Sequence, residues 1–249
     1  MQERSLDTEP DHSHQAVVAS RRRALCGIIH DSFNAMWCAI RAGRFAIRAT
    51  EQAMHHTIFD TPIVNTLLRW LSIGFLNLTG WKIEGKLPPG SRKSVLIAAP
   101  HTSNWDLPYT LMVAFVLRLN IYWMGKEQIF KPPFRGLMRW LGGIPVRRET
   151  STNLVAASVA AIKAATGPLQ LIVPPEGTRS NTRYWKTGFY YIALGAQVPI
   201  VLAYMDYKKK ISGLGPVFQP TGNIDADMLV IKAFYAPFQG KNADQFHTR

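Results

Sequence analysis

The sequence predicts an α/β protein with a mainly parallel central sheet flanked by helices. Short apolar segments alternate with segments of helical pattern between residues 94 and 205. Such alternation is typical of βαβ units, in which a crossover helix joins two parallel strands. The chain has 249 residues, of which 47% are hydrophobic, so it is long enough to bury one large core. This composition excludes disordered, collagen-like and disulfide-scaffold proteins.

The elements of this expected domain follow one another from residue 94. The strands should be short apolar runs at 94–100, 121–125, 143–146, 169–173 and 198–205. The helices between them should occupy 106–119, 133–142, 152–166 and 184–196. A Pro- and Gly-containing loop at 86–93 precedes the first strand. We therefore expect residues 81–249 to form the α/β domain.

Two further segments precede this domain. Residues 1–20 are polar and acidic, which predicts a flexible tail and excludes a signal peptide of ordinary composition. Residues 21–80 contain two expected helices. No run of 18 uncharged apolar residues occurs, so we expect no conventional transmembrane helix.

The two expected helices within residues 21–80 have the composition of an interfacial membrane anchor. The first places three arginines on one face by helical spacing: Arg41, Arg44 and Arg48. The second begins with Thr61 as N-cap and Pro62 as its first residue, is apolar almost all round and stops at Gly80. Helices of this kind lie on a membrane or cover the core of the domain behind them. We expect the first, and hence a peripheral location on the cytoplasmic face of a membrane.

The charge of the chain favours anionic partners. There are 29 Lys and Arg against 16 Asp and Glu, a net charge of +13. Nucleic acid, phospholipid headgroups and phosphorylated small molecules all suit such a surface. The sequence has no alternating basic and aromatic pattern or recognised nucleic-acid module, which disfavours the first. The two cysteines, Cys26 and Cys38, provide neither metal-site spacing nor a disulfide framework, which favours a reducing compartment.

One histidine and one aspartate stand where parallel sheets bind ligands. His101 directly follows the expected strand 94–100, and Asp106 lies at the start of the next expected helix. Across the turn between them the carboxylate can hold one imidazole nitrogen as N–H and leave the other as a base. Ser103 can cap the helix, because Ser103-x-x-Asp106 resembles a capping box. The alternative is a histidine that merely closes the strand end.

Two other expected strand ends carry arginines. Directly after strand 169–173, Gly177 permits a tight turn, and Arg179 offers a planar guanidinium group for phosphate. Arg147 and Arg148 follow another strand in the same way. The alternatives are a local ion pair between Arg179 and the acid three residues before it, and a solvated pair of arginines. Taken together, the three strand ends predict one pocket with a base beside two anion-binding sites.

The chain resembles the glycerolphosphate and lysophospholipid acyltransferase family, which includes 1-acyl-sn-glycerol-3-phosphate acyltransferases. Four ordered blocks carry the resemblance: His101-Thr-Ser-Asn-Trp-Asp106, Gly143-Ile-Pro-Val-Arg-Arg148, Pro175-Glu-Gly-Thr-Arg179 and Val198-Pro199-Ile200. They span about residues 94–202, and their order and spacing together are highly specific.

The resemblance implies a role for each block. His101 would be the catalytic base and Asp106 its orienting acid. The third block would bind the phosphate of the acceptor, with a contribution from the second: Glu176, Gly177, Thr178, Arg179 and Arg148. Ser103, Arg147 and Pro199 are additional candidates, Pro199 with a possible link to the acyl donor.

The activity implied is transfer of a fatty acyl group from acyl-CoA or acyl-carrier protein to a lysophospholipid or glycerol-phosphate hydroxyl, with 1-acyl-glycerol-3-phosphate favoured. A thioester is already activated, so direct transfer without an acyl-enzyme is expected, with no metal or other cofactor. The expected partners are an anionic membrane surface, the lysophospholipid acceptor and the acyl donor. The alternatives are a different lysolipid or glycolipid acceptor, or a non-catalytic basic protein that binds lipid surfaces or nucleic acid.

Overall fold

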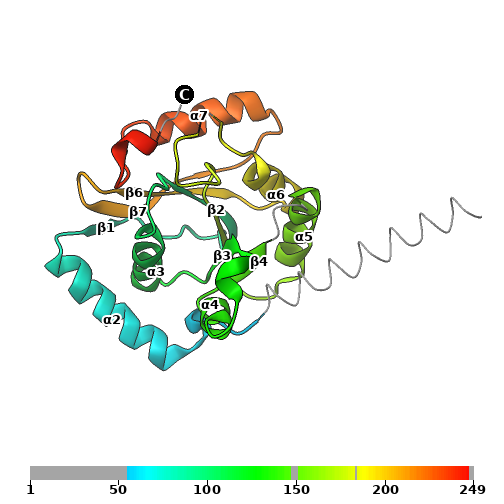
Figure 1. The fold of residues 1–249 in the computed structure, drawn as a ribbon. Coiled ribbons are helices and arrows are strands. Elements are labelled where there is room, and N and C mark those ends of the chain that lie inside the picture. Colours follow the sequence, from blue (N-terminus) through cyan, green and yellow to red (C-terminus); the bar gives the residue numbers. More distant parts are fainter. Residues whose placement is uncertain (1–54, 147–150, 183, 247–249) are drawn as a thin grey trace, which may run out of the picture. The chain divides into compact units, whose positions relative to one another are not determined.

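The structure is a computed structural model that describes residues 55–146, 151–182 and 184–246. The expected tail at 1–20 and the expected basic helix with its three arginines lie outside the described residues. The described residues form a seven-stranded sheet with helices on both faces, as Figure 1 shows. The predicted fold class is confirmed.

The sheet is parallel except at one end. Its strands are β1 (Lys82–Glu84), β2 (Lys93–Ala99), β3 (Ile121–Lys126), β4 (Gly143–Val146), β5 (Leu169–Val173), β6 (Ile200–Asp206) and β7 (Ile211–Phe218). Their order across the sheet is β1-β7-β6-β2-β5-β3-β4. Strand β7 runs antiparallel to β6, and β1 runs parallel to β7. The remaining pairs are parallel, so β2, β3, β4, β5 and β6 all end at one edge, called here the carboxyl edge.

Strand β2 lies at the centre of the parallel part, between β5 and β6. Val95, Leu96 and Ile97 are each at most 1% exposed, although neighbouring side chains point to opposite faces. Helices therefore cover both faces of the strand, which is why its sequence is a continuous apolar run rather than an alternating one.

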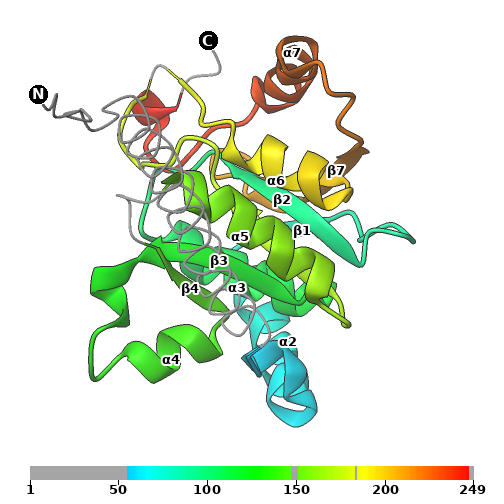
Figure 2. The ribbon, with the colours of Figure 1, turned by 90° about the vertical axis from the view of Figure 1, so that its right-hand side faces the viewer.

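The helices form one layer on each face of the sheet (Figures 1 and 2). They are α2 (Pro62–Leu78), α3 (Asp106–Leu117), α4 (Arg135–Trp140), α5 (Ser151–Ala164), α6 (Gly188–Ala196) and α7 (Ile224–Tyr235), with short 3₁₀ turns at Ile58–Asp60, Glu127–Phe130 and Ala243–Gln245. Buried side chains of α5, α6 and α7 form one core cluster with the sheet. Those of α3 form a second core on the other face, joined by partly buried side chains of α2 and α4.

The sequence missed three elements and misplaced several ends. Strands β1 and β7 and helix α7 were not expected. The helix expected at 184–196 begins only at Gly188, because Lys186 N–H still donates to the Pro175 carbonyl 2.7 Å away in the preceding loop. The helix expected at 106–119 ends at Leu117, where Arg118 takes a left-handed φ of 55°.

Helix α2 occupies the predicted segment, with Pro62 as its first residue. Thr61 precedes it, but no side-chain capping bond forms there, because its hydroxyl donates to the Thr57 carbonyl at 3.3 Å. The helix packs on α3, where Arg69 Nε donates to the Val116 carbonyl at 3.3 Å. Within the part of the chain that the structure describes, every helix is too short or too polar to cross a bilayer.

Candidate active site

His101 and Asp106 meet at the carboxyl edge, as their positions predicted. Strand β2 ends at Ala99, His101 lies two residues beyond it, and Asp106 is the first residue of α3. The Nδ1 atom of His101 lies 3.0 Å from Oδ2 of Asp106. Because Nδ1 faces the carboxylate as its N–H donor, Nε2 is left with its lone pair. Among the described residues none forms a hydrogen bond with Nε2, so this nitrogen can accept a proton from a ligand.

Asp106 is buried at 5% exposure, and its carboxylate is held by four donors. Oδ2 accepts from His101 and from the backbone N–H groups of Thr102 and Ser103, both at 2.9 Å. Oδ1 accepts from the hydroxyl of Tyr207 at 2.8 Å. These donors, at the N-terminus of α3, stabilise the ionised form of the carboxylate.

The capping box predicted for Ser103 forms only in part. Its backbone N–H donates to Asp106, as the motif requires, but its hydroxyl accepts from Trp105 N–H at 3.2 Å instead of capping the third residue on. The reason is that α3 begins at Asp106 itself, so the N-cap position falls on Trp105 and not on Ser103. Ser103 therefore shapes the turn between His101 and Asp106, called here the dyad. Any contact of Ser103 with substrate stays a prediction.

Glu176 contacts the loop that carries His101. It follows β5, and its Oε1 accepts the backbone N–H of His101 at 3.0 Å. The residue is 3% exposed, and Oε2 has no hydrogen-bond partner among the described residues. Burial raises the pKa of this carboxyl to about 7, although hydrogen bonds from the backbone of Glu176 and His101 oppose the shift. The phosphate-binding role predicted for Glu176 stays untested, while its observed contact is with His101.

The rest of the third block forms an open turn. Gly177 has a φ of +62°, and a Cβ built there would lie 2.7 Å from Cδ and 3.0 Å from Nζ of Lys186. The position therefore favours glycine for two reasons: its positive φ, and the Lys186 side chain that occupies the space of a Cβ. Arg179 is exposed. The alternative ion pair between Glu176 and Arg179 does not form between these two described residues.

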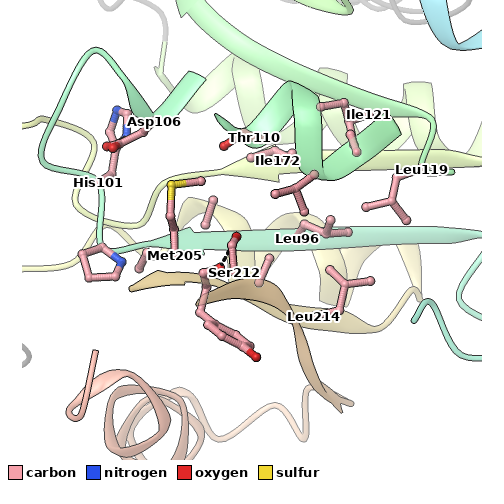
Figure 3. A pocket seen from close by; sticks show the side chains of 17 residues that line it. Leu96, His101, Asp106, Thr110, Leu119, Ile121, Ile172, Met205, Ser212 and Leu214 are labelled. Atoms are coloured by element: carbon pink, nitrogen blue, oxygen red, sulfur yellow. Dashed lines mark hydrogen bonds and ion pairs between the residues drawn. The ribbon is translucent and has the colours of Figure 1, made fainter. Parts of the chain in front are cut away.

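An apolar pocket extends inward from the dyad, between α3 and the sheet. Its cavity volume is about 50 Å³, and it opens to solvent. His101 and Asp106 line one end, and Leu119 and Ile121 line the other (Figure 3). Val113 contributes to the walls, which are mainly aliphatic. The imidazole thus stands at one end of a small, mainly apolar cavity.

The structure does not bring all predicted residues together. Arg147 and Arg148 lie outside the described residues. Pro199 precedes β6, and its carbonyl accepts from Val95 N–H at 3.0 Å near the beginning of β2. About five residues of strand, or roughly 17 Å, separate Pro199 from the carboxyl edge. Pro199 therefore lies before its strand and away from the dyad, and its role toward the acyl donor stays a prediction.

Sequence reasoning missed two sources of support for the dyad loop. Tyr207 comes directly after β6, so its position at a strand end is the signal in the sequence that indicates it. The second source is the C-terminal segment: Asn242 Nδ2 donates to the Thr102 carbonyl at 2.7 Å. With its side-chain amide turned to satisfy both groups, Gln245 donates to the carbonyls of Thr102 and Arg179, at 3.2 and 2.6 Å. No local pattern in the sequence marks these two residues.

Among the described residues, no group of three or more His, Cys, Asp or Glu side chains is arranged to hold a metal ion. The expectation that catalysis needs no metal stays a prediction.

Comparison with known proteins identifies a family for this chain. The crystal structure of the 1-acyl-sn-glycerophosphate (LPA) acyltransferase PlsC from Thermotoga maritima is similar over 88% of this chain and 99% of that one, with 16% identity and a TM-score of 0.49. No match was found among curated proteins. The model of the Acyltransferase family matches residues 81–206, which is just over half of the chain and includes the dyad and the third block. The chain therefore belongs to the acyltransferase family.

Proposed function

We propose that this acyltransferase moves a fatty acyl group from a thioester donor, acyl-CoA or acyl-carrier protein, to a hydroxyl of a lysophospholipid or glycerol-phosphate acceptor. The favoured acceptor is 1-acyl-glycerol-3-phosphate. The observation that carries the proposal is the His101–Asp106 dyad at the mouth of an apolar pocket. A base beside an apolar cavity suits acyl transfer to a hydroxyl, because the base activates the hydroxyl and the cavity receives apolar atoms of the donor.

In the proposed reaction, Nε2 of His101 takes the proton of the acceptor hydroxyl while its oxygen attacks the thioester carbonyl carbon. The tetrahedral intermediate then expels the thiolate, the C–S bond breaks, and the imidazolium returns the proton to sulfur. Asp106 fixes the tautomer of the imidazole and stabilises its positive charge. General-base assistance of this type contributes roughly 10²–10⁴-fold to the rate.

The pocket would hold the part of the donor's acyl chain that lies next to the thioester. Burial of each methylene group contributes about 0.8 kcal/mol, which anchors the donor independently of its head group. Leu119 and Ile121 line the end remote from His101, so their side chains would limit how far the chain enters.

The acceptor phosphate would lie over the turn that begins at Gly177. Arg179 and Thr178 belong to this turn, and the ammonium group of Lys186 lies against it. Arg148 and Arg147, outside the described residues, would complete the cationic surface. We assign Glu176 to holding the backbone of His101, because a carboxylate so buried, when ionised, would repel a phosphate.

We also propose that α2 lies on an anionic membrane surface, where a lipid acceptor resides. Its large exposed apolar side chains repeat at helical spacing: Ile63, Leu67, Trp70, Leu71, Phe75 and Leu78. Exposed lysines follow β6, and one of them, Lys210, donates to the Thr79 carbonyl beside the end of the helix at 3.0 Å. Apolar and cationic groups side by side suit the interface of an anionic bilayer.

Aromatic contacts link α2 to the dyad. The ring of Phe75 lies 6.4 Å from that of Tyr109, one turn beyond Asp106 on α3. Tyr109 in turn lies 5.8 Å from Tyr207, which donates to Asp106. A membrane under α2 would therefore lie close to the mouth of the site.

The test is product analysis by lipid mass spectrometry with a panel of lysolipids and both donor types, presented in anionic vesicles and in detergent. Acylated phosphate-bearing lysolipid is the expected product. A double variant, Leu67→Ser with Leu71→Ser, should lose vesicle binding and activity on vesicles but keep activity in detergent. The control is Leu229→Ser on α7, where the side chain is 73% exposed, against 58% for Leu67 and Leu71. Absence of product under every condition contradicts the enzymatic proposal, and unchanged vesicle binding by the double variant contradicts the membrane role of α2.

A further inference from the structure

We propose that Tyr207 is a positioning residue that fixes the Asp106 carboxylate and, through it, the His101 imidazole. The inference rests on the proposed role of the dyad. The hydroxyl of Tyr207 donates to Oδ1 of Asp106 at 2.8 Å, on the side of the carboxylate opposite the contact with His101. Tyr207 lies outside the four sequence blocks that carry the family resemblance.

The ring of Tyr207 is held in place from several sides. Its backbone N–H donates to the Gln239 carbonyl at 2.9 Å, next to the C-terminal segment. The ring packs edge-on against Trp81 at 5.1 Å and against Tyr109 at 5.8 Å. A phenol fixed in this way loses little conformational entropy when it forms its hydrogen bond, so it can hold Asp106 in one rotamer.

The hydroxyl is the one donor that Oδ1 has among the described residues, since the other three donors all reach Oδ2. Without it, a buried carboxylate oxygen would lack a partner, and the negative charge would shift toward the oxygen that faces His101. The bond therefore sets both the orientation of Asp106 and the strength of its attraction for the imidazole proton.

Tyr207 keeps its proton at any working pH. Burial, followed by the charge and hydrogen bond of Asp106, raises the pKa of its phenol far above the ordinary value. Because this proton points to Asp106, the hydroxyl does not serve the substrate as a donor. Tyr207 thus acts through Asp106 and is not itself a catalytic residue.

Other ionisable groups also face the pair. Glu176 reaches it from the loop after β5, and Tyr109 reaches it from α3. Their influence is common to the parent and to a variant that lacks only the Tyr207 hydroxyl, so a difference between these two proteins reports on that hydroxyl.

The experiment compares Tyr207→Phe with the parent and with Tyr109→Phe, which removes a hydroxyl from the same aromatic cluster without a bond to Asp106. In Tyr207→Phe we expect kcat to fall about tenfold or more, with both KM values changed less than about twofold. The acidic limb of the pH profile should move to higher pH, because a less stabilised Asp106 anion holds the imidazolium proton more tightly. Tyr109→Phe should match the parent in all three quantities.

Two measurements separate this proposal from the proposed function. The first is NMR titration of His101 labelled with ¹⁵N, without any substrate: the histidine should titrate at higher pH in Tyr207→Phe than in the parent. The second is a double-mutant cycle, in which Tyr207→Phe should cost nothing further once Asp106→Asn is present. An unchanged titration of His101, or independent losses in the cycle, overturns the role of Tyr207. A shifted titration in a protein without acyltransferase activity supports it and refutes only the proposed function.

Discussion

Two buried aspartates in this molecule have nearly the same hydrogen-bond chemistry but different surroundings. Asp106 accepts from the Tyr207 hydroxyl, and Asp227 accepts from the Tyr190 hydroxyl at 2.7 Å. Both lie in the first turn of a helix, α3 and α7, and both are at most 5% exposed. Both also accept backbone N–H groups from the residues that precede their helix.

The difference lies in the remaining partners of each carboxylate. Asp227 accepts from the N–H and hydroxyl of Thr221, both at 2.8 Å, so its partners are the turn before α7 and Tyr190 in α6. Asp106 instead faces His101, whose second nitrogen is directed to no other described residue and which lines a pocket. The same carboxylate–tyrosine pair thus stabilises a helix start in one region and orients a base in the other. A base with an open position beside a cavity is what distinguishes the active site.

The largest expected effect is on the catalytic side of this comparison. His101→Ala should lower kcat by about 10²–10⁴-fold, because the general base is lost, while the fold stays intact since a partly exposed residue at a strand end contributes little packing. Asp106→Asn should also lower kcat strongly through loss of tautomer control. Thioester cleavage by the purified proteins measures kcat, and their circular dichroism measures whether the fold is retained. Near-parental turnover of His101→Ala would remove the base from the mechanism.

The next largest effect should come from Arg179, the arginine proposed to bind the acceptor phosphate. Arg179→Ala should raise the KM for the phosphorylated acceptor about tenfold to a hundredfold, since one charge-assisted contact is worth roughly 1.5–3 kcal/mol. The KM for the donor should change far less. Arg92→Ala is the matched control, because Arg92 is exposed just before β2, at the opposite edge of the sheet. An equal rise for both substrates argues against phosphate binding by Arg179.

Asp227 should show the reverse pattern. Asp227→Asn should lower the free energy of unfolding by about 1–3 kcal/mol, because a buried set of hydrogen bonds loses its anionic acceptor. The activity of the folded fraction should not change. Asp225→Asn, exposed in the same turn of α7, should cost less than about 1 kcal/mol. Denaturant unfolding and active-site-normalised turnover test the pair; a loss of turnover in folded Asp227→Asn would break the comparison between the two aspartates.

The sequence predicted the parts of this picture that depend on local pattern. Apolar runs located five of the seven strands, and their ends located His101 and Glu176, because the carboxyl ends of parallel strands share an edge. Strand β7 was missed because Gly213, Gly215 and Pro216 interrupt its apolar pattern. Gly213 lies so close to the backbone of Glu84 in β1 that a Cβ would collide with it, a requirement that only the folded sheet reveals.

The residues that hold the dyad loop in place could not be predicted from the sequence for a different reason. Tyr207 is 101 residues from Asp106 in the chain, and the contact depends on β6 lying next to β2 in the sheet. Asn242 is 140 residues from Thr102. Strand order and the path of the C-terminal segment decide such contacts, and neither follows from periodicity or composition.

The smallest expected effect concerns Glu176, the buried carboxyl that accepts the backbone N–H of His101. It appears in the pH dependence of the free energy of unfolding. Its folded-state pKa is raised to about 7 from an ordinary value of 4.5. For an acid shifted upward, the contribution to stability is complete below the ordinary value, falls as pH rises through the folded-state value and is constant above it. The parent should therefore lose stability between about pH 4.5 and 7 because a buried carboxyl must ionise. Glu176→Gln should abolish this part of the loss.

The glutamine should also keep most of the activity, because its amide oxygen can still accept the backbone N–H of His101. Glu176→Ala, which removes that acceptor, should lose activity in addition to the pH dependence. Unfolding free energies across the pH range, measured with turnover for the three proteins, decide the matter. If Glu176→Gln is as inactive as Glu176→Ala while remaining folded, the carboxylate itself is needed in the reaction. Glu176 would then resemble Asp106, whose charge serves catalysis, instead of Asp227, whose charge serves the fold.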